Sequence, residues 1–179
     1  MTPKFVNFLR ILKNAVIFFI CISLISIVLL RFFNPPFTSF IILESKFFKK
    51  NYSFEWTPIE KAGKNILLAM VSTEDARFCS HMGFDLTELY KVYVKKERRG
   101  ASTISQQVAK NLFLWSGRSY VRKGLEAYLA LLLEIFLPKK RILEIYINIV
   151  ETAPLSFGVN SLSLASFDRT VDKLNKDQA

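Results

Sequence analysis

The feature that most restricts the fold is an uncharged stretch near the start of the chain. Seventeen residues lie between Lys13 and Arg31, and they are rich in Ile, Phe, Leu and Val. As a helix they would span about 26 Å, near the lower limit for crossing the hydrocarbon core of a bilayer. The flanking basic side chains can extend that span by reaching toward the interface. We therefore expect residues 14–30 to form one transmembrane helix.

A cleaved signal peptide is the alternative for this stretch. The apolar run is long for a signal peptide, and residues 31–36 offer no small-x-small cleavage site. Basic residues stand on both sides of the span: Lys4, Arg10 and Lys13 before it, and Arg31, Lys46, Lys49 and Lys50 after it. Charge therefore favours neither orientation strongly.

Composition limits the possible partners. The formal net charge is +10 at pH 7, which suits nucleic acid or an anionic membrane surface. The basic residues interleave with apolar helical segments and no recognised nucleic-acid motif occurs, so we expect no nucleic-acid partner and favour anionic lipid headgroups. Cys21 lies in the apolar span and Cys79 in a later motif, so no disulfide framework is expected.

The pattern divides the chain into four segments. Residues 1–13 precede the span, residues 14–30 form it, and residues 31–55 make a membrane-exit linker that begins with Phe32–Phe37. Within the linker, residues 41–50 and 52–56 read as an irregular amphipathic connection. Residues 56–179 read as one mainly α-helical domain.

Ionisable residues gather in a first motif, Glu74-Asp-Ala-Arg-Phe-Cys-Ser-His-Met-Gly-Phe-Asp85. It follows the apolar run Ile66–Val71, which would fix it against a core. Partial desolvation would raise the pKa of Glu74 toward neutrality, where a carboxylate can accept a proton from a hydroxyl. His81, the one histidine of the chain, is more often a structural residue than a base in such a setting.

A glycine-led turn opens the second motif, residues 100–111. Thr103 and Gln106 have the T-x-x-Q spacing of a capping box, which predicts the start of a helix. Four apolar residues of that helix share an arc of about 80°: Ile104, Val108, Leu112 and Trp115. The neighbouring arc carries Gln107, Lys110 and Asn111. Amides beside an ammonium suit a polar ligand, although a solvated face remains the alternative.

Residues 118–136 read as a long helix that Ser119 can cap and Pro138 ends. Its core positions are Leu125, Tyr128, Leu129, Leu132 and Phe136. Arg122 and Glu126 are four residues apart, so they form either a surface ion pair worth a few tenths of a kcal/mol or, with Arg118 and Lys123, an anion site. The basic run 139–141 reads as solvated, and another amphipathic helix follows it.

Four motifs occur in a fixed order: Glu-Asp-x-x-Phe-x-x-His-x-Gly-x-Asp at 74–85, Gly-x-Ser-Thr-Ile-x-Gln-Gln-x-x-Lys-Asn at 100–111, Arg-Lys-x-x-Glu at 122–126, and Lys-x-x-Ile-Leu-Glu-x-Tyr-x-Asn at 139–148. Together they resemble the successive motifs of the family 51 glycosyltransferases, which are peptidoglycan glycosyltransferases. The short length resembles the monofunctional biosynthetic transglycosylase branch. The resemblance covers residues 56–158.

The resemblance implies a lysozyme-like helical fold behind a single membrane helix. It also implies a cytoplasmic amino terminus and a catalytic domain on the periplasmic side of a bacterial inner membrane. The partners would be the membrane, lipid II, the growing glycan strand and other cell-wall synthesis proteins. No resident cofactor is firmly implied, and a divalent cation, Mg²⁺ or Mn²⁺, accompanying the pyrophosphate is left open.

The resemblance also implies roles for individual residues. Glu74 matches the general base, which takes the proton from the acceptor's 4-hydroxyl as that oxygen attacks the donor's anomeric carbon. Glu126 matches a second catalytic carboxylate that organises the pyrophosphate site. The substrate-binding positions would be Ser102, Gln106, Gln107, Lys110, Asn111, Arg118 and Arg122. Cations at these positions would stabilise the charge on the leaving pyrophosphate.

The sequence departs from the family pattern after Asn148. Ala153 and Pro154 stand in a loop where glycine is usual, and residues 160–162 replace a glutamate and alanines. The family's final alanine- and leucine-rich helices have no counterpart before residue 179. These departures predict a shortened domain in which Ile145 and Ile149 lack cover.

Three functions therefore remain open. The first is a glycan polymerase acting on lipid II. The second is a catalytically weak membrane-anchored relative that binds lipid II or cell-wall synthesis partners. The third, a lysozyme-like hydrolase, is disfavoured because a cationic cluster suits a pyrophosphate leaving group better than attack by water.

Overall fold

The computed structural model describes residues 3–36, 38–39, 42, 56–95, 100–153, 156–175 and 177–178. The described α-helices are α1 (Pro3–Leu30), α3 (Lys64–Glu74), α4 (Leu86–Lys95), α5 (Ile104–Phe113), α6 (Tyr120–Phe136), α7 (Lys139–Ile149) and α8 (Val159–Phe167). Three short 3₁₀ helices accompany them, η1 (Ile59–Lys61), η2 (Phe78–Ser80) and η3 (Val171–Lys173). The fold is mainly helical, which confirms the prediction from the sequence.

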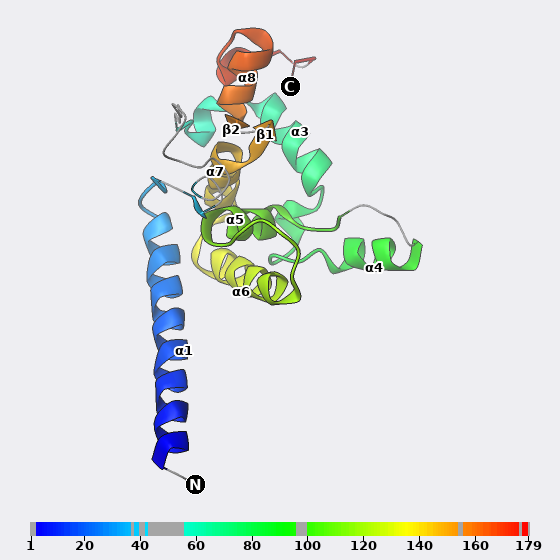
Figure 1. Cartoon of the computed structure of the whole chain (residues 1–179). Helices are drawn as coiled ribbons and strands as arrows, with labels where there is room; N and C mark the ends of the chain where they lie inside the picture. Colours follow the sequence, from blue (N-terminus) through cyan, green and yellow to red (C-terminus); the bar gives the residue numbers. More distant parts are fainter. Residues whose placement is uncertain are drawn as a thin grey trace.

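A small hairpin was not predicted. Strands β1 (Glu151–Ala153) and β2 (Ser156–Phe157) pair antiparallel, with Glu151 opposite Phe157. The hairpin follows α7 directly and leads into α8, so it returns the chain to the side of the domain that carries η3 (Figure 1).

Helix α1 extends away from the rest of the molecule (Figure 1). Residues 4–30 are long and apolar enough to cross a membrane, with a mean hydropathy of 2.4 in the most apolar window. Within α1 the buried residues are Ser23, Ile27 and Leu30, which share one face at i, i+4 and i+7. The carboxyl-terminal third of α1 therefore packs on the domain, while residues 4–22 are exposed. Most of the predicted linker, residues 43–55 included, lies outside the described residues.

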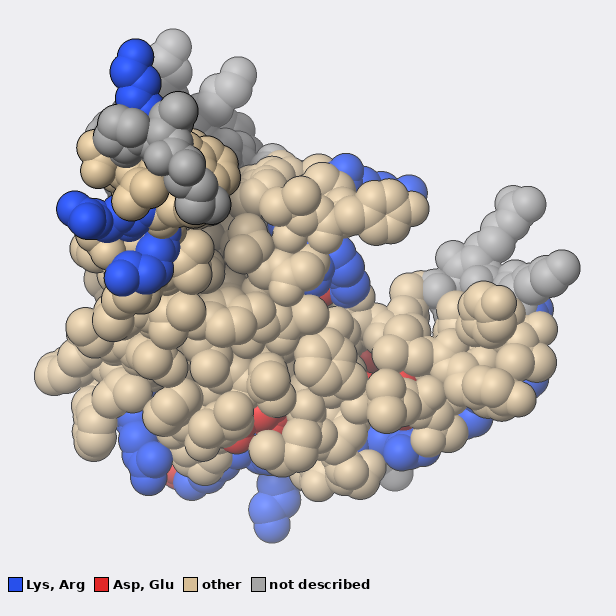
Figure 2. All heavy atoms as spheres, turned by 90° about the horizontal axis from the view of Figure 1, so that it is seen from below, with Lys and Arg blue, Asp and Glu red and all other residues tan. Residues whose placement is uncertain are grey.

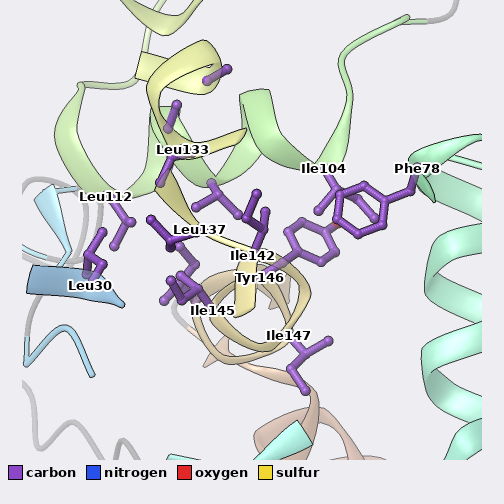
Figure 3. Packing of buried hydrophobic residues seen from close by; sticks show 14 of the residues in the cluster. Leu30, Phe78, Ile104, Leu112, Leu133, Leu137, Ile142, Ile145, Tyr146 and Ile147 are labelled. Carbon is purple, nitrogen blue, oxygen red and sulfur yellow. The ribbon is translucent and has the colours of Figure 1, made fainter. Parts of the chain in front are cut away.

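Helix α7 lies at the centre of the core. Its Ile142, Ile145, Ile147 and Ile149 are fully buried, and Tyr146 is 1% exposed. Figure 3 shows Ile142, Ile145 and Tyr146 on the side of α7 that faces labelled residues of α1, α5 and α6, while Ile147 points to the other side of the α7 axis. The prediction that Ile145 and Ile149 lack cover is wrong. The segment after α7 folds back, and its buried residues Val159 and Val171 belong to the same core cluster.

Two polar contacts fix the end of α7. The Asn148 side chain accepts from the Thr57 backbone N–H at 2.7 Å and donates to the Thr57 carbonyl at 2.9 Å. Gly158, with a φ of 81°, passes so close to α7 that an added Cβ would lie 2.9 Å from the Asn148 carbonyl oxygen. A side chain there would combine a left-handed backbone with a backbone clash. This close approach explains why a Phe-Gly pair ends the hairpin.

The basic run 139–141 is only partly solvated, contrary to the prediction. Lys140 forms an exposed pair with Glu60. Lys139, by contrast, pairs with buried Glu134 at 2.7 Å and lies over the Phe78 ring. Arg141 donates to the carbonyls of Leu30 and Phe33, both at 2.8 Å. Two of the three basic residues therefore hold helices together, because Lys139 joins α7 to α6 and Arg141 joins α7 to the end of α1.

The start of α5 forms as the sequence predicts. Thr103 accepts from the Gln106 backbone N–H, and the Gln106 side chain accepts from the Thr103 N–H at 3.0 Å, which completes the capping box. The predicted apolar arc is buried at Ile104, Val108 and Leu112 but not at Trp115, which is 42% exposed. The helix ends at Phe113, so Trp115 no longer follows the helical spacing that would place it on this arc. Leu114 is buried instead.

Candidate active site

A cavity of about 650 Å³ lies where the end of α3 meets the start of α5. This volume is in the range of small-molecule sites. Its wall combines the first two motifs with α4, through Glu74, Asp75, Arg77, Asp85, Glu88, Lys91, Ser102, Thr103 and Gln107, among others. The tertiary structure thus brings together two segments that are about 30 residues apart in the sequence.

Glu74 stands at this cavity as the last residue of α3. Its side chain is exposed, and its Oε2 accepts from the Gln107 side-chain amide at 2.9 Å. The predicted desolvation of Glu74 is therefore not provided by the described residues. The carboxylate is instead open to the cavity and held by one neutral donor, so an incoming hydroxyl can reach it.

A hydrogen-bonded chain orients that donor. The Tyr146 hydroxyl contacts Gln107 Oε1 at 3.4 Å, on the other side of the amide from Glu74. Burial, with smaller contributions from the Glu74 and Asp75 carboxylates, raises the pKa of Tyr146 above its usual value. The hydroxyl therefore keeps its proton and acts as the donor to Gln107. The amide nitrogen is then directed at Glu74.

The residue after Glu74 has a structural role. Asp75 is buried, and its two oxygens contact His81 Nε2 at 2.8 Å and the Ile104 backbone N–H at 3.0 Å. Asp75 thus joins the first motif to the first turn of α5. His81 is also buried, which confirms the structural role predicted for the only histidine.

Glu126 has different surroundings. It is 3% exposed, and it pairs with Arg122 Nη1 at 2.6 Å and with Lys123 Nζ at 2.5 Å. Because the Arg122 side chain is itself only 12% exposed, the alternative of a simple surface pair does not hold. The first turns of α6 therefore carry a buried carboxylate flanked by two cations, which leaves an excess positive charge.

Lys110 of α5 faces the same cluster. Burial lowers the pKa of Lys110 below its ordinary value, and the Glu126 carboxylate partly opposes this shift. Arg122 and Lys123 act in the same direction as burial, since neighbouring positive charges disfavour a further one. Lys110 is thus electrostatically coupled to Glu126 of the cluster and, in the same direction, to Glu151 of β1.

A single contact links the cationic cluster to the cavity. Lys123 Nζ donates to the Ser102 hydroxyl at 3.0 Å, and Ser102 lines the cavity wall. The two predicted halves of the site are therefore adjacent. Lys123 was named in the sequence as part of an anion site, but its bond to Ser102 depends on how α5 and α6 pack.

The remaining predicted substrate-binding residues lie in three kinds of surroundings. Gln106 is 5% exposed and its Oε1 is used in the helix cap. Asn111 is 4% exposed, and its Oδ1 has no hydrogen-bond partner among the described residues. Arg118 is exposed just before α6. The structure therefore brings Ser102 and Gln107 to the cavity and Lys110 and Arg122 to the cationic cluster.

The described residues do not suggest a protein-built metal site. Within them, no group of three or more His, Cys, Asp or Glu side chains could hold a metal ion. Both Glu126 oxygens already contact a cation, so a divalent ion bound there would meet repulsion from Arg122 and Lys123.

Comparison with known proteins gives one consistent result. A family model described as "Transglycosylase" matches residues 43–179. The chain belongs to the transglycosylase family. The match begins upstream of residue 56, where the sequence patterns placed the start of the domain.

Relatives of the transglycosylase family carry the name "Biosynthetic peptidoglycan transglycosylase". One from Pseudomonas fluorescens is 40% identical over 179 residues, which cover 95% of this chain and 75% of the relative. One from Shewanella oneidensis is 42% identical over 164 residues, covering 88% and 70%. One from Bdellovibrio bacteriovorus is 40% identical over 178 residues, covering 94% and 71%. This transglycosylase chain is shorter than each of them.

Some residues of the site were not singled out from the sequence. The sequence indicates Tyr146 only as a motif position, and it does not indicate Glu88 or Lys91 of α4. A signal existed for Tyr146, because it is the one hydroxyl on an otherwise apolar face of α7. The α4 residues gave no signal, since a charged exposed helix is the ordinary pattern of a protein surface.

Proposed function

We propose that this transglycosylase is a peptidoglycan glycosyltransferase that polymerises lipid II into β-1,4-linked glycan and releases undecaprenyl pyrophosphate. Membership of the family supports the reaction class. The observation that carries the proposal is the contrast between an open carboxylate, Glu74, and a buried carboxylate, Glu126, that holds cations beside the same cavity.

In this proposal Glu74 is the general base. It accepts the proton of the acceptor sugar's 4-hydroxyl, and the oxygen then forms a bond to the donor's anomeric carbon. The bond from that carbon to the pyrophosphate oxygen breaks, and the pyrophosphate leaves with the electron pair. Attack from the face opposite the leaving group inverts the carbon and gives the β linkage. Gln107 holds the base in place and Tyr146 orients Gln107.

The leaving group needs positive charge. Lys110, Arg122 and Lys123 oppose two carboxylates, Glu126 and the Glu151 that also acts on Lys110, so the cluster keeps one excess positive charge for a pyrophosphate. Arg118, exposed at the entrance to α6, would add a further cation when substrate binds. Glu126 would act as the organiser of these cations, because without it they repel one another.

The polar residues of α5 divide between binding and support. Ser102 and Gln107 line the cavity and would hydrogen-bond sugar or phosphate oxygens. Asn111 could supply a further hydrogen bond if its side chain turns toward the ligand. Gln106 would act mainly through the helix cap, which directs the amino-terminal end of α5 and its positive partial charge toward an anion.

We further propose that α1 anchors the enzyme as a single-pass helix in the bacterial inner membrane, with its catalytic domain on the periplasmic side. Its length and hydropathy support a membrane span. A reporter that is active only in the external compartment, fused after Ala179, should be active. Activity of a matched reporter that works only in the cytoplasm, fused at the same position, would show that the domain lies on the cytoplasmic side.

The function is tested with purified protein and labelled lipid II. A polymerase converts the monomer into long glycan, and the Glu74→Gln variant should bind the monomer without polymerising it. Binding without polymer in the unaltered protein would support the alternative of a catalytically weak relative. Breakdown of preformed glycan would indicate the hydrolase and would overturn the proposal.

A further inference from the structure

A third carboxylate, Glu134 near the end of α6, is buried in the core. Its side chain is 2% exposed, and it is not among the residues that line the cavity. On the face drawn in Figure 2, Lys and Arg side chains project at the outline, whereas Asp and Glu show only in small patches between other residues. Removing a carboxylate from water is costly unless it is paired and hydrogen-bonded. The partners of Glu134 must therefore offset that cost.

Two donors from different helices share one oxygen of Glu134. The Ser105 hydroxyl of α5 and the Lys139 ammonium of α7 both donate to Oε1, the second at 2.7 Å. Ser105 is fully buried. The Lys139 nitrogen also lies 4.3 Å from the centre of the Phe78 ring, where a cation is attracted to the face of the ring. Glu134 thus connects α6 to α5 and α7, and Lys139 extends this connection to the first motif.

The first motif also approaches Glu134 directly, at Gly83. This glycine has a φ of 82°, and a Cβ added to it would lie 3.3 Å from the Glu134 Cγ. The absence of a side chain therefore permits both the left-handed backbone and the close approach of Glu134. The Gly83 carbonyl accepts from the Thr103 hydroxyl at 2.7 Å, and Thr103 is the N-cap of α5. The loop of the first motif is thus held between α6 and the start of α5.

These contacts bear on the geometry of the proposed base. Glu74 is the last residue of α3 and directly precedes the loop 75–85. Gln107 lies one turn after Thr103, to whose carbonyl its backbone N–H donates at 3.0 Å. The contact of 2.9 Å between Glu74 and Gln107 therefore joins the two segments that Glu134 connects. An apolar side chain at position 134 would fill the same space, but it would accept neither hydrogen bond.

We propose that Glu134 is a positioning residue for the transfer reaction. It does not touch the substrate. It acts by fixing the loop 75–85 and the start of α5 relative to each other, which sets the separation of Glu74 and Gln107. A misplacement of about 1 Å in a catalytic group can lower a rate by about 10²-fold. This inference rests on the proposed function, and its expected signature is a loss of kcat in protein that remains folded.

Replacing Glu134 tests the role most directly. In the full chain, with labelled lipid II as substrate, Glu134→Ala should lower kcat by about 10–100-fold with little change in KM. Val171→Ala is the core control, because it removes buried apolar atoms from the same core cluster. It should lower the melting temperature but leave the kcat of the folded protein nearly unchanged. An unaltered kcat in Glu134→Ala, or an equal loss in Val171→Ala, overturns the inference.

A milder pair of variants decides the question if Glu134→Ala does not fold. Ser105→Ala removes one of the two donors to Glu134. Ser163→Ala is its matched control, since Ser163 is 1% exposed and its hydroxyl donates to the Arg169 carbonyl at 2.6 Å. Each variant removes one buried hydroxyl with one hydrogen bond, so their effects on stability should be similar. Ser105→Ala should lower kcat several-fold and Ser163→Ala should not, whereas equal kcat values overturn the inference.

A double-mutant cycle tests the route through Gln107. If Ser105 and Glu134 act by placing Gln107 against Glu74, the losses of kcat in Ser105→Ala and Gln107→Ala should not be additive. Additive losses overturn the inference and leave the proposed function standing. If the unaltered protein forms no polymer, the proposed function fails and the positioning role fails with it.

Discussion

The end of α3 and the start of α6 each present a glutamate to the same part of the molecule, but in opposite surroundings. Glu74 is exposed and accepts one bond from a neutral amide. Glu126 is 3% exposed and holds two cations. A carboxylate must be accessible to take a proton from a hydroxyl, whereas a carboxylate between two cations is stabilised in its charged form. The comparison supports the proposal of a base in the first region and of an organising carboxylate in the second.

The two regions also differ in what their loss would do to the fold. Glu74 contributes one exposed hydrogen bond, so its removal should affect chemistry without affecting stability. Glu126 joins α6 to Ser102 of the α5 entrance through Lys123, so its removal should disturb both. Four predictions test this division, from the largest expected effect to the smallest.

Glu74→Gln should lower the rate of lipid II polymerisation by about 10²–10⁴-fold, the usual contribution of a general base. The variant keeps the size of the side chain and loses its basicity, so the melting temperature and lipid II binding should change little. Turnover of labelled lipid II measures the effect, and Glu60→Gln, an exposed carboxylate paired with Lys140, is the matched control. Near-normal turnover in Glu74→Gln would show that Glu74 is not the general base.

Glu126→Gln should lower polymerisation by about 10²-fold, as expected for loss of a group that preorganises charge in the site. Unlike Glu74→Gln, it should also lower the free energy of unfolding by about 1.5–3 kcal/mol, because a buried charged hydrogen bond is lost. Arg122 and Lys123 would then be free to move apart, so the KM for lipid II should rise. The comparison between the two regions fails if Glu126→Gln changes turnover alone and leaves stability and KM unaltered.

Activity should begin to fall at a lower alkaline pH than it would if Lys110 had the pKa of an ordinary lysine. Burial lowers the pKa of Lys110, so its positive charge is lost below the usual 10.5 and the leaving group loses a cation. The free energy of unfolding should instead increase over this pH range. Folded Lys110 loses its proton at the lowered pKa, so the cost of burying its charge disappears as the pH rises toward 10.5. A pH profile of kcat/KM measures this, and Lys110→Arg should move the alkaline limb upward. An unmoved limb would show that another group titrates.

Tyr146→Phe should lower kcat several-fold with little change in KM. The variant removes the hydroxyl that orients the Gln107 amide, and one hydrogen bond is worth about 0.5–1.5 kcal/mol. Tyr128→Phe is the matched control, since it also removes one bonded hydroxyl but at the contact with α1. Equal effects of the two variants on kcat would indicate a general loss of packing, not a loss of orientation of the base.

The local patterns in the sequence predicted much of the structure. The capping box at Thr103, the cap at Ser119, the helical periodicity and the apolar amino-terminal helix all depend on residues within a few positions of one another. The motif glutamates were found in the same way, because their neighbours are specified along the chain. The caps, the helical periodicity and the apolar helix are confirmed because short-range chemistry decides them, while the roles of the glutamates stay predictions.

Long-range packing accounts for what the sequence did not predict. Ile145 and Ile149 are buried in a core cluster that includes residues of α1, α5, α6 and the segment after the hairpin, and Trp115 left the buried arc because α5 ends two residues earlier. Lys139 and Arg141 found acceptors on α6 and on the end of α1. No pattern within one helix contains that information.

The sequence alone therefore determined the family motifs, the helical class and the apolar amino-terminal helix, and it singled out both candidate carboxylates. Only the tertiary structure decided which carboxylate is open and which is enclosed, that Tyr146 orients Gln107, and that α6 lies beside α1. Residue type and spacing specify what a side chain can do chemically. Its exposure and its partners depend on the elements that pack against it, and those come from distant parts of the chain.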